Sequence, residues 1–229
     1  MSPPLNDAYT IEGAELQSIT FTVEPEETAW SEKGAVTSKS QAIRSGIAFS
    51  LNRDNGWLKS FLYLFGRKIS GEDIIMLKHE NQGSTNEQIS FVPPRASRIL
   101  AIDLNETGRV HLQRGIFFAA KGAIDISLGI AVNLITVLFG EPIIMQTLKG
   151  NGVAAIASTG NVTEHTLNGD ELKVDISLLL GYSEGITYKT GLAGSILAMM
   201  LGGEGLVMAK MSGHGKVWVK ATTEQRQGS

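Results

Sequence analysis

A six-residue motif that occurs three times constrains the fold more than any other feature of the chain. The copies are GEDIIM at Gly71–Met76, GEPIIM at Gly140–Met145 and GEGLVM at Gly203–Met208. Their glutamates, Glu72, Glu141 and Glu204, are separated by 69 and 63 residues. A period of this length exceeds the ~20–50 residues of solenoid repeats. It predicts three similar modules packed side by side within one chain.

The residues around the motif are typical of β-strands. Ile19, Phe21 and Val23 alternate with threonines, the period-two pattern of a half-buried strand. Gly-Asn-Gly at 150–152 and Gly-His-Gly at 213–215 follow the second and third copies, and such glycines are typical of tight hairpin turns. We therefore predict an all-β protein with internal pseudo-threefold symmetry, and short helices at most in its apolar linkers.

The repeat also predicts the domain organisation. Each module reads strand, turn, strand, apolar linker, motif strand, hairpin turn and last strand. We expect an N-terminal tail at 1–10, one compact domain at 11–221 and a C-terminal tail at 222–229. Within the domain the repeats cover about 11–94, 95–159 and 160–221.

Three apolar linkers precede the three motifs: residues 57–66, 128–140 and 191–203. The charge-free runs around them are shorter than the ~18–20 residues needed to span a bilayer. They allow three readings: a core where the modules meet, an oligomer interface, or a membrane-surface contact. The membrane reading is the weakest, because only the first linker carries lysine or arginine. The candidate interface residues are Trp57, Phe61, Phe65, Leu134, Leu138, Phe139, Leu197, Met200 and Leu201.

Composition excludes several classes of function. The chain has no cysteine, so it has no disulfide, thiolate nucleophile or cysteine-ligated metal. Its net charge of −3 lacks the basic field that nucleic-acid binding requires. The N-terminus resembles neither a secretory signal nor a mitochondrial presequence, which predicts a cytoplasmic protein.

The motif residues and the histidines have a functional and a structural reading. Three carboxylates near a pseudo-threefold axis could bind a cation or a basic partner. Alternatively, each glutamate caps a turn or pairs with a lysine or arginine, and we favour this structural role. No two histidines lie at metal-ligand spacing, and His79 and His214 are expected in hairpin turns, so we predict no metal and no cofactor. The residues assigned the structural role are Gly71, Glu72, Gly140, Glu141, Gly203 and Glu204.

A catalytic set is also not predicted. The closest polar cluster is Asp103, His111 and Arg114. Strand alternation places these side chains partly on opposite faces, so they do not converge on one cleft. We therefore expect no enzymatic activity.

The repeated Gly-Glu motif, the closing segment LGGEGLVMAKMSGHGKVWVKA and the segment HLQRGIFFAA resemble the altered-inheritance-of-mitochondria, or mitochondrial-biogenesis, family. The resemblance covers about Tyr9 to Ala221. It implies a fold like that of the tryptophan RNA-binding attenuation protein, a β-sandwich or double-stranded β-helix module repeated within the chain. The tryptophan- and RNA-binding residues of that protein have no matching pattern here. The mitochondrial inner-membrane association of fungal members is not expected to carry over, because the N-terminus does not resemble a presequence.

Repetition, apolar linkers and the lack of a catalytic set favour a non-enzymatic scaffold or interaction protein, a homo-oligomer that could also bind other proteins. One alternative, by analogy of fold alone, is a small-molecule-binding regulatory module. A peripheral membrane-associated organiser is another.

Overall fold

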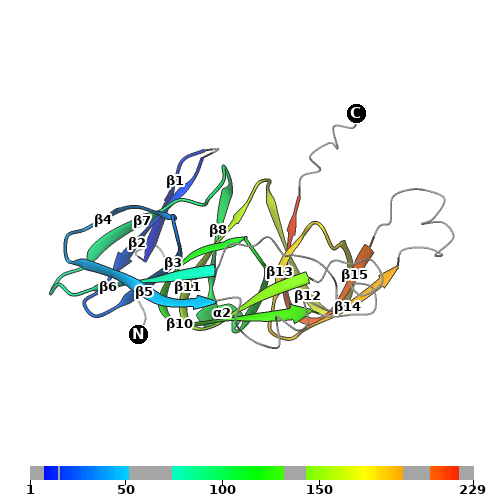
Figure 1. Cartoon of the computed structure of the whole chain (residues 1–229). Helices are drawn as coiled ribbons and strands as arrows, with labels where there is room; N and C mark the ends of the chain where they lie inside the picture. The colour runs from blue at the N-terminus through cyan, green and yellow to red at the C-terminus, as the bar shows by residue number, and fades with distance from the viewer. Residues whose placement is uncertain (1–7, 15, 52–73, 132–142, 193–206, 222–229) are drawn as a thin grey trace. The chain divides into compact units, whose positions relative to one another are not determined.

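The computed structural model (Figure 1) describes residues 8–14, 16–51, 74–131, 143–192 and 207–221. These residues form β-strands joined by turns, with one helical turn, which confirms the all-β prediction. They divide into two compact units. Unit 1 comprises 1–99 and 118–123, and unit 2 comprises 100–117 and 124–229.

Unit 1 contains two antiparallel sheets. The first has the strand order β1-β2-β7-β4, and the second has the order β3-β6-β5, with residues 119–121 of β10 paired to β3. The strands are β1 (Tyr9–Glu12), β2 (Ser18–Val23), β3 (Thr28–Glu32), β4 (Val36–Lys39), β5 (Ile43–Leu51), β6 (Ile74–Asn81), β7 (Glu87–Phe91) and β10 (Phe117–Ala131).

The core of unit 1 follows the predicted alternation. Ile19, Phe21 and Val23 of β2 are fully buried, while the threonines between them are half-buried. Phe91 of β7 packs on Phe21 at a ring-centroid distance of 5.8 Å and on His79 of β6 at 5.6 Å. The buried faces of the two sheets therefore meet around Phe91.

The first strand includes two residues expected in the N-terminal tail. Tyr9 and Thr10 pair with Phe21 and Thr20 of β2. Tyr9 also contacts Phe21 edge to face, at a centroid distance of 6.4 Å. Within the described residues, regular structure therefore begins at Tyr9.

Unit 2 contains long antiparallel strands. Its order is β12-β15-β13-β9-β11-β10, and β14 also pairs with β15 while β8 pairs with β11. The elements are β8 (Arg98–Asp103), α2 (Leu104–Thr107), β9 (Val110–Gln113), β11 (Ile143–Ser158), β12 (Val162–Asp175), β13 (Leu179–Ser183), β14 (Ile186–Leu192) and β15 (Val207–Lys220).

One apolar cluster of unit 2 is built on β15. Ala209, Met211 and Val217 of this strand are fully buried against Leu167 and Val174 of β12. They share one face because their positions differ by even numbers. Trp218 faces the other way and is also fully buried.

The prediction of hairpin turns at Gly-Asn-Gly and Gly-His-Gly is wrong. Both segments lie inside single strands, β11 and β15. Their glycines do have positive φ, but they bend a continuous strand. At Gly213 a side chain would overlap the Gly185 carbonyl, which accepts a hydrogen bond from the His214 amide at 3.1 Å. Because Gly213 and Gly215 have no side chain, the turn between β13 and β14 can pack directly against β15.

Asn168-Gly169-Asp170, which is also a sequence typical of turns, lies inside β12. β12 continues through this segment with a bulge opposite Gly213 of β15. β15 pairs with β12 on both sides of Gly169 and Asp170, so these two residues form a bulge and the strand does not reverse.

Helices were expected only in the apolar linkers, most of whose residues lie outside the described ranges. The one described helix, α2, lies elsewhere. Asp103 caps it by accepting a 2.8 Å hydrogen bond from the Asn105 amide, and Gly108 ends it at a φ of 67°. The turn residues between β8 and β9 therefore form one helical turn.

Candidate functional site

All the residues proposed from sequence as motif or interface positions lie outside the described ranges. They are Gly71, Glu72, Gly140, Glu141, Gly203, Glu204, Trp57, Phe61, Phe65, Leu134, Leu138, Phe139, Leu197, Met200 and Leu201.

The strands that flank the apolar linkers are described. Leu51, the last residue of β5, pairs with Ile74, the first of β6. Leu192, the last of β14, pairs with Val207, the first of β15. β10 and β11 are likewise neighbours in the strand order. The chain therefore enters and leaves each linker through adjacent strands, and the apolar end of each motif begins a strand, as predicted.

A polar network centred on His79 lies in the core of unit 1. His79 is 1% exposed, and its Nε2 lies 3.0 Å from Ser31 Oγ on β3. Its Nδ1 lies 2.8 Å from Ser45 Oγ on β5, which accepts a 2.7 Å hydrogen bond from Lys39 Nζ. Ser45 can then donate to Nδ1, and Nε2–H can donate to Ser31. Both ring nitrogens are satisfied in the neutral state.

The electrostatics of this network oppose catalysis. Burial, together with a smaller effect of the Lys39 cation, lowers the pKa of His79 to about 4. An imidazole with this pKa is a weak general base at neutral pH. Its second nitrogen contacts a serine, which stabilises an imidazolium less than a carboxylate would. The Ser–His pair is therefore best explained as a buried structural network.

The position of His79 was predicted incorrectly. It lies within β6 and not in a hairpin turn, and Ser31 and Ser45 were not identified as its partners. Lys78 and Glu80 alternate with His79 and Asn81, so the period-two pattern of a strand was present in the sequence. The network itself could not be predicted, because β3 and β5 are distant from His79 in sequence and local sequence does not identify the strands that pair with β6.

Stability should depend on pH through His79. We expect the free energy of unfolding to fall as pH decreases from about 6.5 to 4, by up to roughly 3 kcal/mol, because the unfolded chain binds the proton more readily. Urea unfolding at a series of pH values measures this. His79→Gln should remove that part of the pH dependence, whereas His165→Gln, at a half-buried histidine, should not. An unchanged profile for His79→Gln would contradict the assignment.

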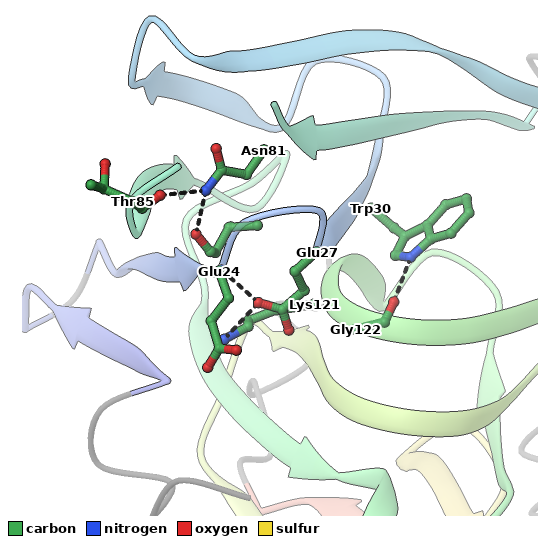
Figure 2. Close-up of polar contacts among 8 residues, drawn as sticks. Glu24, Glu27, Trp30, Asn81, Thr85, Lys121 and Gly122 are labelled. Carbon is green, nitrogen blue, oxygen red and sulfur yellow. Dashed lines mark hydrogen bonds and ion pairs between the residues drawn. The ribbon is translucent and has the colours of Figure 1, made fainter. Parts of the chain in front are cut away.

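A second polar cluster joins β10 to the turn before β3 (Figure 2). Lys121 Nζ lies 3.1 Å from Glu27 Oε2, and the lysine side chain is 9% exposed. The same carboxylate oxygen accepts a 2.8 Å hydrogen bond from the Glu24 amide. Beside it, Trp30 Nε1 donates to the Gly122 carbonyl at 2.9 Å. The ion pair neutralises a buried cation, so its role is structural.

Asn81, which Figure 2 also shows, forms hydrogen bonds at the end of β6. Its Nδ2 donates to the carbonyls of Val23 at 2.9 Å and Thr85 at 2.8 Å. Its Oδ1 accepts from the Gly83 amide at 2.8 Å. A buried amide with these partners stabilises the β6–β7 turn.

In unit 2, a row of polar and aromatic side chains crosses neighbouring strands. Thr147 of β11 pairs with His111 of β9, which pairs with Tyr182 of β13. Thr147 Oγ1 lies 3.0 Å from His111 Nδ1, and Tyr182 stacks on Tyr188 at 6.0 Å with an interplanar angle of 2°. Burial lowers the pKa of His111 and raises that of Tyr182, so both side chains are neutral at neutral pH.

Asp103 and His111, two residues of the polar cluster considered from sequence, lie on β8 and β9 and have different partners. Asp103 caps α2, and His111 contacts Thr147. Within the described ranges, no group of three or more acidic, histidine or cysteine side chains has the geometry of a metal site. In the same residues, no helix has the length and apolarity needed to cross a bilayer.

Gln146 is the most anomalous polar side chain of unit 2. It is fully buried on β11, opposite Leu112 of β9 and two residues before the buried Leu148. Neither its Nε2 nor its Oε1 has a hydrogen-bond partner among the described residues. A buried amide left unsatisfied costs about 1–3 kcal/mol for each group. The fold therefore tolerates a substantial penalty at this position.

Comparisons with known proteins agree on family and fold. A crystal structure of a protein from Streptococcus pyogenes has a TM-score of 0.68 to this chain, with 18% identity, and the match covers 94% of this chain and 93% of that one. An uncharacterized protein of S. pyogenes serotype M6 is 24% identical over 174 residues, which are 75% of this chain and 68% of the relative. Residues 9–222 match the family described as mitochondrial biogenesis AIM24, and the chain therefore belongs to that family.

Proposed function

We propose that this protein is a non-enzymatic scaffold that assembles into a homo-oligomer in the cytoplasm. The observation that carries the proposal is the arrangement around the three apolar linkers. Each linker joins two neighbouring strands, β5 to β6, β10 to β11 and β14 to β15. This recurrence supports three tandem modules with pseudo-threefold symmetry, in which the same apolar element is presented three times.

Repeated apolar segments of this kind are better suited to association between subunits than to catalysis. The polar networks at His79, Lys121 and Asn81 are internally satisfied structural networks. An apolar surface that repeats within one chain can bury area against a second copy. The proposal therefore assigns the linker residues, including Phe65, Leu138 and Leu201, to subunit contacts.

Light scattering coupled to size-exclusion chromatography tests the proposal. We expect a discrete oligomer, and Leu138→Asp should shift it toward monomer, because a buried unpaired carboxylate opposes association. Leu16→Asp is the control, since Leu16 is 72% exposed and lies outside the linkers. A wild-type protein that is monomeric at every concentration would contradict the proposal.

Sedimentation with anionic liposomes separates the membrane-organiser alternative from this proposal. A scaffold whose linkers form subunit contacts should remain in the supernatant. Co-sedimentation that Leu138→Asp abolishes would instead place the linkers at a membrane surface.

One observation favours a small-molecule-binding module as a second candidate. The buried amide of Gln146 would be satisfied by a ligand that offers a donor and an acceptor side by side. Thermal unfolding in the presence of single amino acids and nucleotides tests this. A ligand-dependent rise in melting temperature that is lost in Gln146→Leu would support it, and no shift with any probe would count against it.

A further inference from the structure

Two strands stand at the ends of the strand order, β5 in unit 1 and β12 in unit 2. Among the described residues, β5 pairs with β6 and β12 pairs with β15, each along one side. The other side of an edge strand presents alternate backbone N–H and C=O groups that can pair with another strand. Both edges are therefore sites where a sheet could continue.

The β5 edge is apolar and weakly basic. Residues 44–48 are all exposed, and the side chain of Ile47 is 72% exposed. Arg44 is the only charged residue in the strand, and Lys39 lies beside it, donating to Ser45. A bulge at Ala48 leaves Ile43–Ile47 as a regular segment. Exposed edges usually carry more charge than this one, because charge prevents unwanted pairing.

The β12 edge is acidic. The strand contains four carboxylates and one lysine, Lys173. Glu164 and Glu171 form ion pairs with lysines of β15. Asp170 is exposed at the bulge after Asn168. The regular segment before that bulge, residues 162–168, is long enough to pair with all of Ile43–Ile47. An antiparallel register with Ile43 opposite Asn168 would set Arg44 at the end of the segment next to Asp170.

We propose that β5 of one copy pairs with β12 of a second copy, so that a sheet continues from molecule to molecule. This inference rests on the proposed self-assembly and deepens it by adding a second contact to the one assigned to the linkers. The pairing satisfies the backbone groups of both edges, buries Ile47 and brings a basic edge to an acidic one. Pairing of β5 with another β5 would instead bring two Arg44 side chains together and leave the acidic edge unused. The contact is heterologous, since two different surfaces meet.

Charge reversal at each edge tests the pairing. Arg44→Glu should weaken self-association roughly tenfold, because it places an acid against the acidic β12 edge, and Asp170→Lys should do the same from the other side. The matched controls are Arg95→Glu and Glu106→Lys, which make the same charge changes at exposed positions outside both strands. Sedimentation velocity over a concentration series measures the association. Far-UV circular dichroism checks that each variant is folded.

Mixing the two variants gives the decisive result. An equimolar mixture of Arg44→Glu and Asp170→Lys should regain association, since the unchanged β5 of one variant meets the unchanged β12 of the other. Weakening by Arg44→Glu alone, with Asp170→Lys still fully associated, would overturn the β5–β12 pairing in favour of β5–β5. A wild-type oligomer insensitive to both variants would overturn the pairing and leave the scaffold proposal intact. A monomeric wild type would contradict both.

Discussion

Replacing Trp218 with alanine is expected to lower the free energy of unfolding by about 3–5 kcal/mol, the usual cost of removing a buried tryptophan. The side chain is fully buried on β15. Its Nε1 donates a 2.8 Å hydrogen bond to Glu164 Oε2 of β12. The substitution would leave a cavity and remove a partner of the Glu164 carboxylate. Chemical denaturation followed by far-UV circular dichroism measures the loss.

Trp218→Phe separates the two contributions. It keeps most of the buried ring but removes the N–H donor, so the loss should be nearer 1–2 kcal/mol. Burial by itself would raise the pKa of Glu164, but the hydrogen bonds from Lys216 and Trp218 and the charge of Lys216 together outweigh burial and lower it. Trp218→Phe should therefore also raise the Glu164 pKa. A loss below 1 kcal/mol for Trp218→Ala would show that the packing at this position is not close.

Replacing Gln146 with leucine is expected to raise the free energy of unfolding by about 1–3 kcal/mol, although most core substitutions destabilise. The substitution removes two buried polar groups that have no partner among the described residues and adds apolar surface beside Leu112 and Leu148. The same denaturation experiment measures the gain.

Gln113→Leu is the matched control for that substitution. Gln113 donates a 2.8 Å hydrogen bond from Nε2 to the Ile176 carbonyl, so the same change there should lower stability. A destabilised Gln146→Leu would show that the Gln146 amide is satisfied in solution, by water or by a ligand.

The alternation of side chains made much of the fold predictable. Ile19, Phe21 and Val23 formed a buried strand face as expected, and the apolar end of each Gly-Glu motif began a strand. Alternation is a local property, since successive side chains point to opposite faces whatever the neighbouring strands are.

Turns were predicted less well. Gly213 and Gly215 have the positive φ that their glycines suggested, yet the chain continues through them as β15. A positive φ can reverse a chain or bend a strand, and the hydrogen-bond partners that neighbouring strands offer decide between these outcomes. Those partners come from β12 and β14, which local sequence does not identify.

By itself, the sequence determined the all-β class, because the alternation of side chains is local, and the threefold recurrence of the motif, which is read directly from the residues. The tertiary structure decided which strands pair, and therefore which side chains meet. His79 finds its partners on β3 and β5, Lys121 finds Glu27, and Gln146 has a buried position without a described partner. These contacts join residues far apart in sequence, and the free energy of each depends on burial and geometry that exist only once the sheets have formed.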